Sequence, residues 1–226
     1  MVLEQLVAIL RKDLLTISRK WHEVAALAVI SVVMGLAVAY MVSGPLAPLA
    51  EPIDASVVLA SSQIIVYFIV SIAAGFIAVL REAEKGTLDG LRASPVSPES
   101  LFLAKLLYIY LLIIVLSFAF IFSTIFFSGY SAVLSWDYAA LSLAVSLYFA
   151  SASALTSFMI IYSEARSLLS MVVLSGLLVP FLQGAGRALA AAASGVATGG
   201  QVAQILGASL GFAAIATVLA RPLAEI

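Results

Sequence analysis

Six long apolar stretches constrain the fold of this chain more than any other feature of its sequence. Each contains at most one charged residue and is close to the roughly twenty residues that a helix needs to cross a bilayer. Only helices and closed barrels satisfy every backbone hydrogen bond in hydrocarbon, and unbroken apolar runs of this kind indicate helices. The sequence therefore predicts an all-α, polytopic membrane protein of a single domain (1–226), with transmembrane helices at 24–43, 57–80, 101–127, 138–163, 167–183 and 202–220.

The overall composition supports this class. Hydrophobic residues make up 64% of the chain and charged residues 10%, whereas a soluble domain has about 25% charged residues. The absence of cysteine excludes disulfides and thiolate chemistry. A glycine- and alanine-rich segment, 184–200, follows the fifth predicted helix, and the sequence leaves open whether it is a loop, a surface helix or a re-entrant excursion.

The first twenty residues have the pattern of a basic amphipathic helix. Apolar residues recur at three- and four-residue spacing, at Leu3, Leu6, Val7, Leu10, Leu14 and Ile17. We expect this helix, 1–20, to lie in the headgroup region and to contact membrane lipid, because its cations and its apolar face suit that position. The alternative is a cytoplasmic extension packed on protein. A signal peptide is excluded because Arg11, Lys12 and Asp13 interrupt the apolar run.

The distribution of Lys and Arg predicts the orientation. Ten of them fall on one face of the predicted bundle and only Arg187 on the other, and such an excess marks the cytoplasmic side. We therefore expect both termini and the 81–100 loop to be cytoplasmic, in a multi-pass protein of the inner (cytoplasmic) cell membrane. The ten are Arg11, Lys12, Arg19, Lys20, Arg81, Lys85, Arg92, Lys105, Arg166 and Arg221.

The stretch 81–105 is the one long polar interruption of the apolar pattern. Gly86 can end the helix that descends from the second span, since glycine adopts the left-handed conformation at little cost. Thr87 can cap a second, short helix that carries Leu88 and Leu91 on one side. Pro95 stops that helix, because it disfavours helical geometry at the preceding residue and lacks an amide.

A third helix is predicted to begin directly after this proline. Ser97 is a suitable N-cap, Pro98 suits the first helical position, and Glu99 is favourable near the positive end of the helix dipole. A short cytoplasmic helix is therefore expected between two longer ones, in a position to dock on a partner.

The spans contain almost no ionisable residue at mid-membrane depth, which argues against a membrane enzyme or an ion-coupled transporter. Lys105 and Glu164 lie at predicted span ends, where we expect their side chains to reach the interface. Gln63 and Gln183 are the main amides within apolar runs. We expect both amides to form hydrogen bonds between helices.

No cofactor or metal is expected in this chain itself. The single histidine, His22, follows Trp21 at the start of the first span, and we interpret it as an interfacial residue rather than a heme or metal ligand. The chain also lacks the GxxxxGK phosphate-binding loop, so ATP and magnesium would bind only to a partner. We expect no nucleic-acid partner.

Small residues recur four apart in three of the spans and allow close approach of helices. We interpret these positions as packing within one bundle, with a dimer contact as the alternative. They are Ser71 and Gly75, Ser146, Ala150 and Ala154, and Gly207 and Gly211.

The polar stretch also resembles the cytoplasmic loop of a known family, the type 2 ABC exporter permeases. Among these, the chain length, the six spans and the basic N-terminal helix are most similar to the heme exporter permeases of the CcmB type, as are Arg166 and Pro180. The motif consists of Glu84-Lys85-Gly86-Thr87-Leu88-Asp89-Gly90-Leu91, then Ser94-Pro95-Val96, then Leu103-Ala104-Lys105.

This resemblance implies a permease subunit that forms a homodimer and pairs with a CcmA-like ABC ATPase, with heme as cargo. It also implies CcmC-like and CcmE-like heme-handling partners and no catalytic site in this chain. The implied ATPase-coupling residues are Glu84, Gly86, Thr87, Leu88, Leu91, Ser94 and Pro95. Two alternatives are a type 2 ABC permease for another hydrophobic cargo, such as a lipid, a drug or a glycan carrier, and a membrane scaffold that transports nothing.

Overall fold

The computed structural model describes residues 2–19, 21–43, 54–84, 97–129, 134–160, 166–197 and 199–224. These residues are helical almost throughout and contain no strand. The prediction of an all-α protein is thereby confirmed.

Six helical segments are long and apolar enough to cross a membrane, as predicted. They follow an N-terminal helix, α1 (Val2–Arg19). The second span consists of α3 and a π-helical segment, η1 (Phe76–Leu80), and the helix continues beyond the span as α4 (Arg81–Glu84). The spans are formed by α2 (Trp21–Ser43), α3 (Ala55–Gly75) with η1, α6 (Pro98–Ser128), α7 (Trp136–Met159), α8 (Arg166–Ala193) and α9 (Gly199–Ala224).

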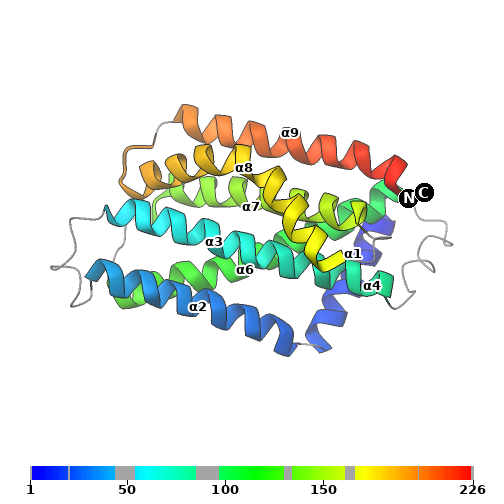
Figure 1. Cartoon of the computed structure of the whole chain (residues 1–226), viewed down its shortest axis with the longest axis horizontal. Helices are drawn as coiled ribbons and strands as arrows, with labels where there is room; N and C mark the ends of the chain where they lie inside the picture. The colour runs from blue at the N-terminus through cyan, green and yellow to red at the C-terminus, as the bar shows by residue number, and fades with distance from the viewer. Residues whose placement is uncertain are drawn as a thin grey trace.

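The long helices lie side by side, and α1 runs across them at one end of the bundle (Figure 1). Both chain termini lie at this end. Helix α4 ends there and α6 begins there, so the two helices that flank residues 85–96 both reach the same end (Figure 1).

Local capping explains why the helices begin where they do. The Ser97 hydroxyl accepts a hydrogen bond from the Ser100 amide at 3.3 Å, and Pro98 occupies the first turn of α6. The predicted restart at Ser97-Pro98-Glu99 is therefore confirmed. Asp54 caps α3 in the same way, accepting from the Ser56 amide at 2.9 Å.

The fifth span is longer than the sequence predicts. Helix α8 does not end at Gln183 but continues through Pro180 to Ala193, so most of the segment 184–200 is neither loop nor re-entrant. Alanine is the best helix former, and the alanine-rich run after Arg187 extends the helix. Near the proline, the Tyr148 hydroxyl donates to the Leu177 carbonyl at 3.2 Å.

Several other boundaries differ from the predicted ones by a few residues. The first span begins at Trp21 rather than at 24, the second at Ala55 rather than at 57, and the sixth at Gly199 rather than at 202. The third span begins at Pro98 rather than at 101, because the cap lies at Ser97. The fourth ends at Met159 rather than at 163, with Ile160 in a non-helical conformation.

Helix α7 is the most buried of the spans, and small residues let its neighbours approach closely. The Ser153 hydroxyl bonds to the Ser71 carbonyl of α3 at 2.5 Å. A Cβ added at Gly75 would lie 2.5 Å from the Ser153 Oγ and 2.6 Å from the Ser157 Oγ. The interpretation as packing within one bundle is confirmed for Ser71 and Gly75.

The same interpretation holds for α7 but is wrong for α9. Ser146, Ala150 and Ala154 are buried within the bundle. Gly207 and Gly211 are exposed, and a Cβ added at either would meet no atom within 4 Å. The close-packing face of α9 instead contains Ile205, Ser209, Ala216 and Ala220.

We predict that Gly75→Ala lowers the thermal stability of the purified protein, because the added methyl group forces two serines apart. Overpacking of this kind costs about 1–3 kcal/mol. Gly211→Ala is the matched control and should leave the melting temperature unchanged or slightly raised, since alanine is the better helix former. Equal melting temperatures for the two variants would contradict the close contact of α3 and α7.

Candidate functional site

Six charged side chains from four helices gather at the end of the bundle where the termini lie. All six line one cavity of about 260 Å³, together with Tyr108. Three are basic and three are acidic, so their formal charges cancel. We call this set the charge cluster: Lys12 and Asp13 of α1, Glu23 of α2, Arg81 and Glu82 of α4, and Lys105 of α6.

Lys105 lies at the centre of the charge cluster and is 0% exposed. Its Nζ is 2.8 Å from Asp13 Oδ2 and 2.7 Å from Glu82 Oε2. The expectation that Lys105 reaches the membrane interface is therefore wrong. Helix α1 packs against α6 and supplies a carboxylate, and a buried ammonium group is tolerated only where such partners exist.

Two more ion pairs lie within the charge cluster. Lys12 Nζ lies 2.7 Å from Glu82 Oε1, and Arg81 Nη1 lies 2.6 Å from Glu23 Oε2. These pairs are partly exposed to solvent, so each contributes less than the buried contacts of Lys105. Together with the contacts of Lys105, they join α1, α2, α4 and α6.

The two carboxylates around Lys105 respond differently to this environment. Burial raises the pKa of Asp13 above its usual value, although Lys105 and Lys12 act in the opposite direction. Burial also acts to raise the pKa of Glu82, but Lys105 and Lys12 outweigh it and hold that pKa below its usual value. Glu82 has two ammonium groups at 2.7 Å, whereas Lys12 is 3.7 Å from Asp13.

The charge cluster brackets the segment 85–96 in the sequence. Arg81 and Glu82 precede it, and Lys105 follows it within the first turns of α6. The Ser100 hydroxyl adds a contact between α6 and α1, donating to the Gln5 Oε1 at 3.3 Å. The helices on both sides of the segment, α4 and α6, thus contact α1.

Of the seven predicted coupling residues, one lies within the part of the chain that the structure describes. Glu84 is the last residue of α4. Gly86, Thr87, Leu88, Leu91, Ser94 and Pro95 lie outside the residues that the structure describes, and the short helix stays a prediction.

Helix α1 has features of both positions considered for it, packed on protein and in contact with lipid. Ile9 and Asp13 are buried, and Leu6, Leu10 and Ile17 pack against the core. This face lies on protein. A second apolar strip, with Val7 57% and Leu15 55% exposed, remains available to lipid.

A second polar group lies deep among the spans, around Gln63. The Gln63 amide nitrogen bonds to the hydroxyls of Tyr67, Ser117 and Ser142 at 2.7, 3.2 and 3.1 Å. Tyr138 donates to the Gln63 carbonyl oxygen. The prediction that Gln63 bonds between helices is confirmed, whereas Gln183 is exposed on α8.

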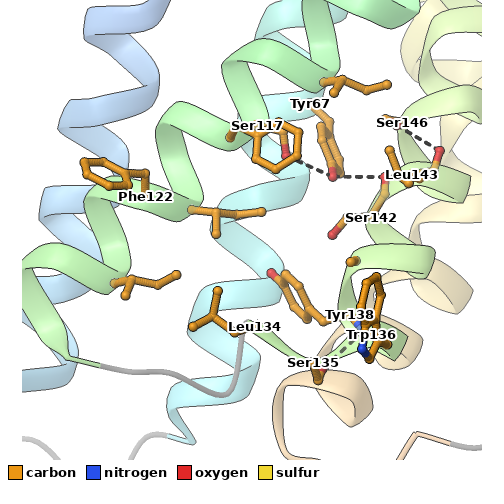
Figure 2. Close-up of a pocket in the computed structure, with 15 residues that line it drawn as sticks. Tyr67, Ser117, Phe122, Leu134, Ser135, Trp136, Tyr138, Ser142, Leu143 and Ser146 are labelled. Atoms are coloured by element: carbon orange, nitrogen blue, oxygen red, sulfur yellow. Dashed lines mark hydrogen bonds between the residues drawn. The ribbon is translucent and has the colours of Figure 1, made fainter.

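A pocket opens beside this network, between the halves of α6 and α7 that lie far from the charge cluster. We call it the lateral pocket, and its volume is about 320 Å³. Figure 2 shows the hydroxyls of Tyr67, Ser117 and Ser142 gathered at its inner side, with Phe122 and Leu134 at its edge. Ser117 is twelve residues after Lys105 on α6, so the two sites are about 18 Å apart along the helix.

The surroundings of His22 do not resemble a heme or metal site. Its side chain is 69% exposed and its Nε2 lies 3.9 Å from a Glu23 oxygen. Within the described ranges, no three His, Cys, Asp or Glu side chains are grouped as metal ligands.

Sequence reasoning missed the charge cluster and the lateral pocket. One signal was present: Asp13 is four residues after Ile9 and four before Ile17, on the apolar side of α1. A carboxylate at such a position needs a cation, and Lys105 is the one charge within the third apolar run. Nothing in the sequence, however, indicates that these two residues meet.

The chain belongs to the ABC-2 type transporter family, whose sequence profile matches residues 4–187. This range includes nearly all of α1, the first four spans and most of α8. Members of this class are membrane permease components of ABC transporters, and they work with an ABC ATPase subunit. A search of curated proteins finds no significant match.

Proposed function

We propose that this chain is the permease subunit of an exporter whose separate ATPase docks on the segment 85–96 and drives the spans through the charge cluster. The observation that carries the proposal is the position of that cluster. Its buried centre, Lys105, holds α1 and α4 on α6, directly at the base of the polar segment.

The proposal includes an orientation. The termini, α1 and the two helices flanking 85–96 lie at one end of the bundle (Figure 1), and the excess of Lys and Arg on that side supports a cytoplasmic location. The other expected features, a location in the inner (cytoplasmic) cell membrane and a homodimer, belong to the same proposal.

For the cargo, heme is the specific proposal. It is supported by the resemblance of the loop motif and of the chain length to heme exporters of the CcmB type, which also implies CcmA-, CcmC- and CcmE-like partners. The second candidate is another hydrophobic cargo, and the uncharged lining of the lateral pocket favours it.

Purification of the tagged chain from its native membrane tests both the permease assignment and the proposed cargo. We expect mass spectrometry to find an ABC ATPase among the co-purified proteins. Heme absorption in the same sample would favour the heme exporter, and its absence together with another bound hydrophobic molecule would favour the second candidate. A sample free of any ATPase would contradict the permease assignment.

We also predict that the rigorously purified chain alone hydrolyses no ATP, because the sequence contains no phosphate-binding loop. Phosphate release should appear only when the partner ATPase is added. ATP hydrolysis that stays with this chain through every purification step would refute the claim that a separate subunit hydrolyses ATP.

A further inference from the structure

We propose that the lateral pocket binds an uncharged amphiphile whose polar head is a single hydroxyl group and whose body is apolar. The pocket lies between α6 and α7, with Tyr67 of α3 at its inner side (Figure 2). The proposal concerns binding alone and does not depend on whether an ATPase drives the chain.

The lining excludes a charged ligand. Among the residues that the structure describes, none that lines the pocket is a Lys, Arg, His, Asp or Glu. The nearest acid in sequence, Asp137, is exposed and is not part of the lining. A phosphate, carboxylate or ammonium group would leave water here without meeting an opposite charge, which is strongly unfavourable.

Most of the lining is apolar and suits a hydrocarbon body. Phe118, Ile121 and Phe122 contribute from α6, and Leu143 contributes from α7. Phe118 and Phe122 are 64% and 71% exposed, so the pocket is open at the surface of two membrane spans. A ligand dissolved in the bilayer reaches it without crossing water.

The inner side supplies acceptors for one hydroxyl hydrogen. Ser117 Oγ accepts from Gln63 and donates to Tyr67, and Ser142 Oγ accepts from the same amide. A hydroxyl oxygen has two lone pairs, so each serine retains one for a ligand. The Gln63 network holds both oxygens in place, because Gln63 is also bonded by Tyr67 and Tyr138.

A tryptophan in the pocket can report ligand binding through its fluorescence. Trp136 lines the pocket and is one of only two tryptophans in the chain. In a Trp21→Phe background, Trp136 is the single indole, and bromine bound in the pocket quenches its fluorescence. We would reconstitute this protein in phosphatidylcholine vesicles and titrate three probes of equal chain length: an ω-brominated alcohol, the bromoalkane, and the ω-brominated carboxylate.

We expect the alcohol to quench at a concentration about fivefold lower than the alkane, which is the effect of one net hydrogen bond. The carboxylate should be weaker than both. Ser142→Ala should remove most of the advantage of the alcohol over the alkane. Ala139→Phe, which fills the pocket from an exposed position, should remove saturable quenching by all three probes.

Val115→Phe is the matched control, since Val115 is 57% exposed on α6 and does not line the pocket. It should leave the three titrations unchanged. Equal quenching by the three probes, or quenching that survives Ala139→Phe, would mean that bromine reaches Trp136 from the bulk bilayer, and the proposal would be overturned.

Discussion

Replacing Leu88 and Leu91 together by aspartate should release the ATPase from this permease. We place both leucines on the docking side of the short helix predicted between Thr87 and Ser94. Two carboxylates there would enter a contact that excludes water. An unpaired buried charge costs several kcal/mol, on the order of a thousandfold in affinity. Affinity purification of the tagged variant, followed by an immunoblot for the ATPase, measures the loss.

The matched control for this experiment is a leucine at the opposite end of the bundle. Leu134 is 70% exposed, so Leu134→Asp makes the same type of substitution once, far from the docking segment, and should retain the ATPase. Gly86→Val should act more weakly than the double aspartate, by straining the turn before the helix. If the double variant is made at normal levels and still retains its ATPase, 85–96 is not the docking segment.

Replacing Lys105 by methionine should destabilise the permease by about 3–5 kcal/mol. The substitution keeps an unbranched side chain, shorter by the terminal nitrogen, but leaves Asp13 and Glu82 without the cation that lies 2.8 and 2.7 Å from them. Removal of one partner from a buried ion pair has a cost of about this size. Thermal unfolding of the purified protein in one fixed detergent gives the measurement.

Two further variants show whether the charge cluster is responsible for that loss. Lys12→Met removes a cation that is 44% exposed and should cost no more than about 1 kcal/mol. The triple variant Lys105→Met, Asp13→Asn, Glu82→Gln removes the buried charges together and should recover much of the lost stability. A triple variant that is no more stable than Lys105→Met alone would show that the ion pairs are not the cause.

The sequence was sufficient for those features that depend on local chemistry. Six apolar runs give six spans, because the bilayer imposes one length and one type of structure. Ser97 begins α6 because a serine followed by proline is a strong helix start. The burial of Gln63 among other helices also follows locally, since an amide in an apolar run needs partners.

The features that carry the proposed function depend on residues far apart in the chain. Asp13 and Lys105 are separated by 92 positions, and only the packing of α1 on α6 brings them together. The lateral pocket combines Tyr67 with residues of α6 and α7 in the same way. The end of α8 was misplaced for another reason: glycine and proline near Gln183 resemble a helix end, but the following alanines continue the helix.

The central claim, that an ATPase docks on 85–96, is tested most directly by crosslinking from that segment in the native membrane. A photoreactive amino acid at position 88 should capture an ABC ATPase, identified by mass spectrometry, while the same group at Trp136, which is 90% exposed at the far end of the bundle, should not. Capture of the ATPase from position 88 alone is the predicted result. Labelling of position 88 by a membrane-impermeant reagent from outside the cell, with no ATPase captured, would contradict the account.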